Sequence, residues 1–201
     1  MKSYKSLTDS VYETVISRSR FISFLYQIEG EDDAKERLAA LRKKYYDATH
    51  VCYAYIADEE GNLCKSSDDG EPSSTAGAPI MSVIGGYRKV LLAAVRYFGG
   101  TKLGVGGLIK AYTDSAINVI ACSIAEEYFE SNIYLALFSY PEYERCKRIL
   151  SNCKLLKADY TDKISCELAA KTDCLLINQI KELFGYVPEI SLIKENTYIK
   201  F

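Results

Sequence analysis

The sequence predicts an α+β protein made of two domains. Its 201 residues are enough for two small hydrophobic cores. Hydrophobic residues make up 48% of the chain and charged residues 26%, which is the balance of a globular protein. Strand-like and helix-like segments alternate, and after residue 131 they follow the order β-α-β-β-α-β, which is typical of a ferredoxin-like domain. We therefore expect domains at residues 1–130 and 131–201, with the boundary near Glu130.

Apolar patterning justifies each element of the first domain. Alternating β-branched and aromatic residues predict strands, and the apolar run that ends at Phe98 predicts a strand buried on both faces. A helix is indicated where Ala34, Leu38 and Leu41 recur at helical spacing between acidic and basic ends. The expected strands are 11–17, 20–28, 49–57 and 89–98, the expected helices are 31–46, 75–84 and 108–125, and the expected loops are 66–74 and 99–107.

The second domain is read in the same way. Pro141 suits the first turn of a helix, and Gly185 suits a helix C-cap. The dipeptide Thr161–Asp162 predicts the turn of a hairpin. The expected strands are 132–139, 155–160, 163–170 and 190–199, and the expected helices are 141–153 and 173–185.

Charge and cysteine content limit the function classes. A formal net charge of −2 excludes a globally basic nucleic-acid binder but leaves room for a local basic patch. The seven cysteines form no C-x-x-C pair, so we interpret them as reduced thiols of a cytoplasmic protein. We expect neither a signal peptide nor a membrane span, because no apolar run is long enough.

An acidic turn carries three carboxylates within four residues, Asp68, Asp69 and Glu71. Neighbouring like charges repel by about 1 kcal/mol per pair even in water. The turn could therefore hold a cation, cap backbone N–H groups or meet a basic partner, and it could also be an ordinary solvated turn. Ser74 or Thr75 could cap the helix that follows.

A glycine-rich basic loop follows the buried strand. Its glycines would let backbone N–H groups approach a phosphate, aided by the N-terminus of the next helix. It matches neither a Walker A loop nor a Rossmann fingerprint, and the glycines could serve only turn formation and close packing. The candidate anion-binding or nucleic-acid-binding residues are Arg96, Gly99, Gly100, Lys102, Gly104, Gly106, Gly107 and Lys110.

Other residues leave the chemistry open. His50 is the only histidine, and it could be a structural residue or a ligand near the acidic turn. Arg20 could be solvated or could contact a phosphate or the acidic turn. No nucleophile–base pair is evident, so catalytic residues are unknown. A divalent cation on the acidic turn is conceivable, but we predict neither a metal nor another cofactor.

Four spaced motifs lie within residues 15–125. They are Ser19-Arg20-Phe21; Ala48-Thr49-His50 with Cys52 and Ala54; Ser67-Asp68-Asp69-Gly70-Glu71-Pro72 with Thr75-Ala76-Gly77; and Arg96-Tyr97-Phe98-Gly99-Gly100 with Leu103-Gly104 and Gly106-Gly107-Leu108. Together these motifs resemble the YigZ/IMPACT family. One departure is Ser74, where that family usually has glycine.

The resemblance implies a fold for each domain and a role in translation. The first domain would be a ribosomal-protein-type α/β sandwich with a left-handed βαβ unit. The second would resemble the C-terminal domain of elongation factor G. The eukaryotic members regulate translation under amino-acid stress, by competing for a partner of an initiation-factor kinase.

We accordingly expect a non-enzymatic, cytoplasmic and monomeric regulator that acts on translation. Its partner would be RNA, the ribosome or a translation-associated protein, met where the acidic turn and the glycine-rich loop face each other. The acidic turn could instead dock a basic protein. The enzymatic alternative is a metal-dependent phosphodiesterase or other hydrolase that uses the acidic turn with His50.

Overall fold

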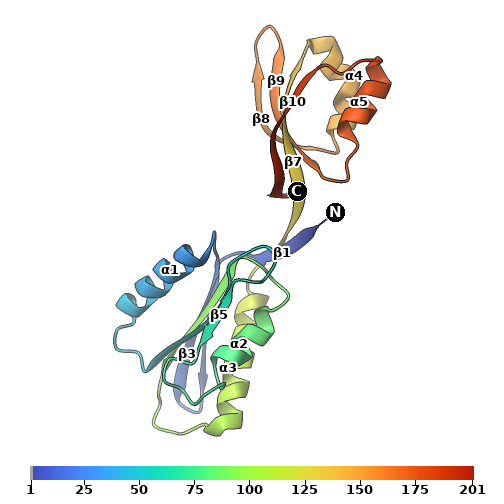
Figure 1. Cartoon of the computed structure of the whole chain (residues 1–201). Helices are drawn as coiled ribbons and strands as arrows, with labels where there is room; N and C mark the ends of the chain where they lie inside the picture. Colours follow the sequence, from blue (N-terminus) through green and yellow to red (C-terminus); the bar gives the residue numbers. More distant parts are fainter. Residues whose placement is uncertain (1) are drawn as a thin grey trace. The chain divides into compact units, whose positions relative to one another are not determined.

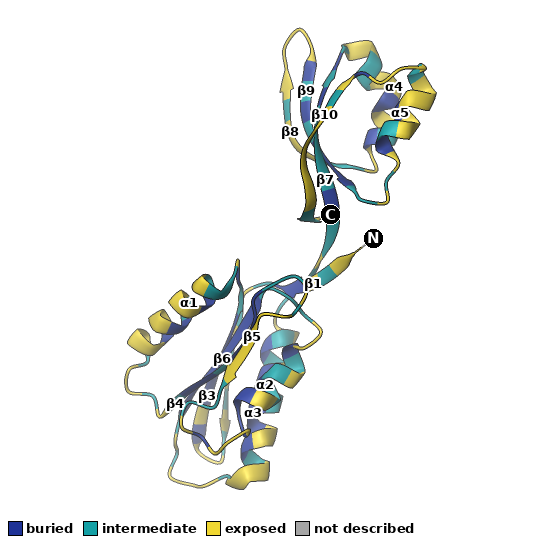
Figure 2. Ribbon diagram, viewed as in Figure 1, coloured by how far each residue is buried: buried dark blue, intermediate teal, exposed yellow. Residues whose placement is uncertain are grey.

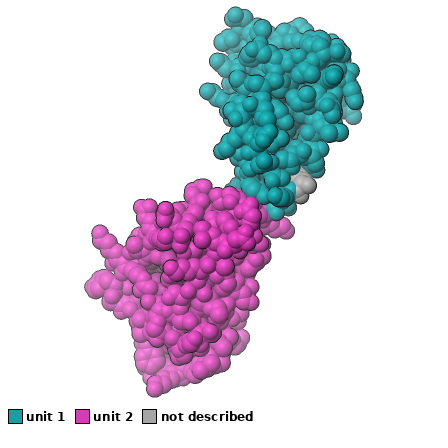
Figure 3. All heavy atoms as spheres, viewed as in Figure 1, with its two compact units in different colours: residues 1–3, 127–201 teal, residues 4–126 magenta. Residues whose placement is uncertain are grey.

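The computed structural model describes residues 2–201 as two compact units. The N-terminal unit is Tyr4–Glu126, and the C-terminal unit is Glu127–Phe201 together with Lys2 and Ser3 (Figure 3). The division precedes the expected boundary near Glu130, because strand β7 already begins at Ala125. The two-domain α+β class is confirmed.

The N-terminal unit is built on a five-stranded antiparallel sheet of order β2-β3-β6-β4-β5. Helix α1 covers one face of this sheet, and helices α2 and α3 cover the other (Figure 1). The expected strands and helices are present, and the structure adds two short strands, β1 and β5. The bounds are β1 Ser3–Leu7, β2 Ser10–Ile16, β3 Ser19–Gln27, α1 Glu31–Lys44, β4 His50–Ile56, β5 Cys64–Ser67, α2 Gly77–Ile84, β6 Val90–Tyr97 and α3 Gly104–Ala121.

Two hydrophobic cores lie on the two faces of this sheet. Alternation along β3 sends Phe21 and Leu25 toward α2 and α3, while Ile22 and Phe24 pack on the side of α1. Strand β6 lies in the middle of the sheet, and seven of its eight residues are buried, as its continuous apolar sequence predicts (Figure 2). The buried strand therefore fixes the position of its two polar C-terminal residues, Arg96 and Tyr97.

Helix α3 begins earlier than expected. The predicted loop 99–107 and helix 108–125 become a shorter loop and a helix from Gly104 to Ala121, so three glycines lie in the first turn. Glycine disfavours helix by about 1 kcal/mol relative to alanine. Burial of Leu108, Tyr112 and Val119 against the sheet outweighs that cost.

The C-terminal unit has the expected β-α-β-β-α-β order. Its strands pair as β10-β7-β9-β8. Strand β1 pairs with β7 in the same sheet, and Glu130 N–H donates to the carbonyl of Lys2, the residue before β1, at 2.9 Å. Ser139 and Glu142 form a capping box on α4, and Gly185 ends α5 with φ 78°. The bounds are β7 Ala125–Phe138, α4 Tyr140–Leu150, β8 Lys154–Tyr160, β9 Ile164–Lys171, α5 Leu176–Phe184 and β10 Glu189–Lys200.

No helix in the described part of the chain, residues 2–201, is long and apolar enough to cross a membrane.

Candidate functional site

The sheet register gathers the sequence motifs at one end of the N-terminal unit. Arg20 of β3 pairs with Tyr97 of β6, and His50 of β4 pairs with Arg96 of β6. The acidic turn follows β5 at this same end, because β5 leaves the sheet opposite Tyr53. Segments that are far apart in the sequence therefore contribute to one site.

Asp68 fastens the acidic turn to the start of α2. Its Oδ1 accepts from the N–H groups of Ala76 and Gly77 at 2.9 and 2.8 Å, and its Oδ2 accepts from Ser74 N–H at 2.8 Å. Burial raises the pKa of Asp68, but the N–H groups outweigh burial and hold that pKa below its ordinary value. The expected cap from Ser74 or Thr75 is wrong, since Thr75 Oγ1 donates to a carbonyl within the turn at 2.6 Å.

Asp69 ties the turn to α1 and β4. Its carboxylate accepts hydrogen bonds from both terminal nitrogens of Arg42, at 2.7 and 3.1 Å, and from the N–H of Val51 at 2.6 Å. Its carbonyl lies 2.8 Å from His50 Nδ1. Because a carbonyl can only accept, His50 Nδ1 carries a proton. Sequence reasoning missed Arg42, although the basic last turn of α1 was a visible signal.

Glu71 forms a buried ion pair with Arg96. Their side chains are 3% and 5% exposed, and Arg96 Nη1 donates to Glu71 Oε1 at 2.5 Å. Tyr112 Oη donates to the same oxygen at 2.8 Å, and His50 Nε2 lies 3.8 Å from Glu71 Oε2. Arg96 Nη2 also donates to Ser19 Oγ at 3.2 Å. The acidic turn and the start of the glycine-rich motif thus meet inside the protein.

Cys52 completes this buried network. Its sulfur lies 3.0 Å from the Asp68 carbonyl oxygen and 3.3 Å from Tyr112 Oη. Burial raises the pKa of Cys52 to about 12, and it also raises the pKa of Tyr112 above its ordinary value. Both groups are therefore neutral at pH 7, and Cys52 is a structural thiol rather than a thiolate nucleophile.

The carboxylates of the acidic turn are all engaged by protein groups. Asp68 binds backbone N–H groups, Asp69 binds Arg42, and Glu71 binds Arg96. Within residues 2–201 no group of three or more His, Cys, Asp or Glu side chains is arranged to hold a metal ion. This donor set supports the capping interpretation of the turn, and it gives no fit for the divalent cation that the alternative hydrolase requires.

The remaining candidate cations lie on the surface. Arg20 makes a two-bond pair with Glu13, at 2.7 and 2.9 Å. Lys110 pairs with Asp114 one helical turn away at 2.8 Å. Lys102 is exposed and has no carboxylate within 4.0 Å among the described residues. The structure therefore separates Arg96, which is buried, from the lysines with which it was grouped.

The glycines of the loop have different roles. Gly99 packs on the backbone of Arg18, where an added Cβ would lie 2.0 Å from the carbonyl oxygen, so it permits close packing. Gly100 and Gly104 have positive φ. At Gly106 the φ is ordinary and an added Cβ would meet no atom within 4 Å. Internal packing accounts for Gly99 but does not account for Gly106.

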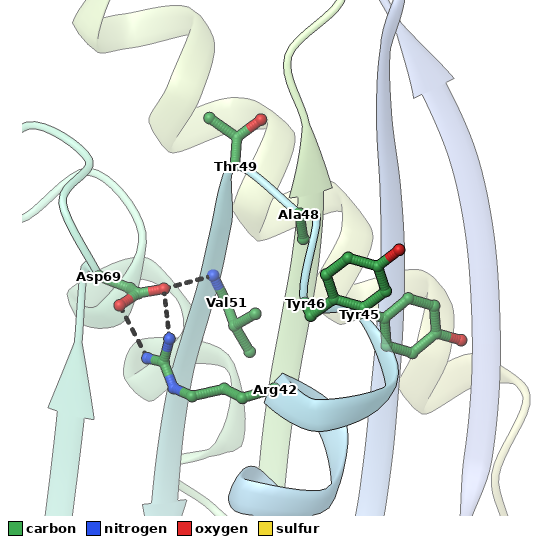
Figure 4. Close-up of a pocket in the computed structure, with 7 residues that line it drawn as sticks. All are labelled: Arg42, Tyr45, Tyr46, Ala48, Thr49, Val51 and Asp69. Carbon is green, nitrogen blue, oxygen red and sulfur yellow. Dashed lines mark hydrogen bonds and ion pairs between the residues drawn. The ribbon is translucent and has the colours of Figure 1, made fainter.

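A pocket of about 360 Å³ adjoins the acidic turn, as Figure 4 shows. The ion pair between Arg42 and Asp69 lies on one side of it, and the ring of Tyr46 lies on the other. Its lining residues are Arg42, Tyr45, Tyr46, Ala48, Thr49, Val51 and Asp69.

This fold and this motif network define a two-unit α+β protein whose N-terminal unit carries the Impact N-terminal domain, which matches residues 17–120. The chain belongs to the IMPACT family. It is 46% identical over 106 residues to the IMPACT family member YvyE of Bacillus subtilis, which covers 52% of this chain and 49% of that protein. It is 31% identical over 151 residues to the IMPACT family member YigZ of Escherichia coli, covering 72% and 74% of the two chains.

The matched regions differ in extent. The chain spans about half the length of YvyE and 60% of an IMPACT family member of Haemophilus influenzae, to which it is 37% identical. A solved structure described as that of an hypothetical protein covers 96% of this chain and 97% of its own, with a TM-score of 0.64 and 25% identity. The fold of both units therefore recurs in a solved protein.

Proposed function

We propose that this protein is a non-enzymatic regulator of translation that binds RNA, free or in the ribosome, through the glycine-rich loop of its N-terminal unit. The observation that carries the proposal is Gly106. A glycine in the first turn of α3 weakens the helix, and neither its φ nor its packing requires it. Close approach of a ligand to the backbone gives a physical reason for that residue.

The start of α3 has the chemistry that a phosphate needs. The first N–H groups of a helix lack partners within the helix, and no side chain caps α3. The helix dipole adds a partial positive charge at this end. Lys102 supplies a full charge, and Lys110 supplies another because its exposed pair with Asp114 is weak and exchangeable. Arg96 is excluded as a donor, since Glu71 holds it.

The translation setting of the proposal comes from membership of the IMPACT family. No observation in the acidic turn favours the hydrolase alternative, because its three carboxylates are bound to protein groups. For the same reason Asp68 and Asp69 do not offer free charge to a basic protein. These facts favour the glycine-rich basic loop as the binding surface, and its charge suits an anionic partner.

The test measures binding of a fluorescein-labelled single-stranded RNA by anisotropy, and binding of purified ribosomes by co-sedimentation. We expect affinity to fall with salt, and Lys102→Glu to weaken binding. Loss of the Lys102 contact alone should lower the slope of log affinity against log salt by about 0.7. Lys65→Glu is the matched control, because Lys65 is also an exposed lysine but lies away from the candidate site. It pairs with Tyr55, whereas the site lies at the other end of β4, at His50. Absence of binding to both RNA and ribosomes, or binding that salt leaves unchanged, overturns the proposal.

A further inference from the structure

We infer that the pocket beside the C-terminal end of α1 binds one unpaired RNA base, stacked on Tyr46, while Lys43 and Lys44 contact the phosphates on either side of it. The inference rests on the RNA binding proposed above and adds a second contact site, outside the glycine-rich loop. It names the chemical feature of RNA that the N-terminal unit would recognise, which is a splayed-out base.

Tyr46 is the first observation. Its residue is 86% exposed, and it makes no hydrogen bond or ring contact with any residue of the described chain. Its neighbour Tyr45 packs against Phe24 with 5.5 Å between the ring centroids, and Tyr97 donates to Asp47 at 2.8 Å. Tyr46 therefore offers an unoccupied π-face, which is the surface on which single-stranded RNA bases stack.

The walls of the pocket suit a neutral, planar and polar ligand. Its inner wall holds the pair between Arg42 and Asp69, whose opposite charges compensate each other. Thr49, on the far side of Ala48 from Tyr46, adds a polar side chain to the lining (Figure 4). A volume of about 360 Å³ lies at the small end of ligand sites, in keeping with a single base.

The surrounding charge suits the phosphates next to such a base. Of the five basic residues of α1, Lys35, Arg37 and Arg42 have carboxylate partners within 4.0 Å. Lys43 and Lys44 have none among the described residues, and Lys44 Nζ lies 5.2 Å from the ring centroid of Tyr45. Both lysines also oppose the negative end of the α1 dipole, but that role requires no exposed aromatic ring beside them.

The pocket is joined to the glycine-rich motif by direct contacts. Thr49 N–H donates to the Arg96 carbonyl at 2.9 Å, and Phe98 N–H donates to Thr49 Oγ1 at 3.0 Å. The pocket therefore borders the residues at the end of β6 where the glycine-rich loop begins. This continuity is what favours a nucleic-acid occupant over an unrelated small molecule.

The experiment uses the full chain and a ten-nucleotide oligouridine that carries 2-aminopurine at its centre and fluorescein at its end. Stacking quenches 2-aminopurine, and anisotropy of fluorescein reports affinity. We expect Tyr46→Ala to weaken binding about 5- to 150-fold and to remove the quenching. Tyr46→Phe keeps the ring and should bind within about twofold of wild type. Replacing Lys43 and Lys44 by Ala should lower the salt slope by about 1.4.

The outcomes separate this inference from the proposed function. Tyr160→Ala, which removes an exposed tyrosine of the C-terminal unit, is the control and should change nothing. RNA binding that persists unchanged in Tyr46→Ala, with quenching intact, overturns the base pocket and leaves the proposed function standing. If Tyr46→Ala reduces ribosome binding but not RNA binding, the pocket contacts protein and the inference is equally overturned. Failure of the wild type to bind RNA in any form overturns both.

Discussion

Replacing Glu71 by Gln should destabilise the N-terminal unit strongly, although the change removes only a charge. The side chain of Arg96 is 5% exposed, and its Nε has no hydrogen-bond partner among the described residues. Glu71 is the carboxylate that faces it at 2.5 Å. The variant would leave a buried cation without its counter-ion.

The magnitude follows from the burial of the pair. Removing one partner of a buried ion pair costs about 3–5 kcal/mol, because the remaining charge stays desolvated. The amide oxygen of the substituted side chain can still accept from Tyr112 Oη, so that hydrogen bond adds little to the loss. The cost is a large share of the stability of about 5–15 kcal/mol that is typical of a domain.

The assay is urea unfolding of wild type and Glu71→Gln, followed by circular dichroism, with the two units allowed separate transitions. Only the transition of the N-terminal unit should move. A double variant, Glu71→Gln with Arg96→Met, should recover part of the loss, because the orphaned cation is gone. Glu13→Gln disrupts an exposed pair and should leave the midpoint unchanged. A loss below about 1 kcal/mol for Glu71→Gln would refute the buried-charge reasoning.

Three further predictions concern the same unit. Gly106→Ala should stabilise it by about 0.5–1 kcal/mol and yet weaken RNA binding, whereas Gly99→Ala should destabilise it by about 1–3 kcal/mol or more. Urea unfolding measures the stability and fluorescence anisotropy measures the RNA affinity. Unchanged RNA affinity of Gly106→Ala would contradict the proposal that a phosphate approaches the backbone there. The pKa of Asp68 is lowered in the folded state, so its stabilisation is present above its ordinary pKa of about 3.9 and is lost as pH falls through the lower folded value. In Asp68→Asn the urea midpoint should therefore fall less steeply with decreasing pH than it does in wild type. An equally steep fall would disprove the contribution of Asp68. Iodoacetamide at pH 8 should label exposed Cys64 rapidly and buried Cys52 only upon unfolding, as peptide mass spectrometry would show; rapid labelling of Cys52 would contradict its raised pKa.

Hydrophobic patterning was sufficient for the main elements because it reports which faces are buried. The apolar run of β6 and the helical spacing in α1 both predicted the observed elements. Strand β5 was missed because Cys64–Ser67 is polar and mostly exposed, and it is a strand only through its pairing with β4. The start of α3 was misplaced because helix propensity ranks glycine low, whereas tertiary packing decided the boundary.

The candidate site shows the same limit in another form. The capping interpretation of the acidic turn could be made from local chemistry, and Asp68 confirms it. The partner of Arg96 could not be identified, because Glu71 lies 25 residues away and only the fold brings the two together. Sequence proximity grouped Arg96 with Lys102, while burial assigns them to different environments. Which charges are available to a ligand depends on tertiary structure.

The buried network has a consequence for how the motifs should be used. Asp68, Glu71 and Arg96 hold α2, β6 and α3 together, so a chain can carry all of them simply to build this unit. A match to these motifs then reports architecture and does not identify the residues that contact a partner. The exposed residues around the network, such as Tyr46 and Lys102, would determine which partner binds. Two proteins with identical motifs could differ at these exposed positions and act in different processes.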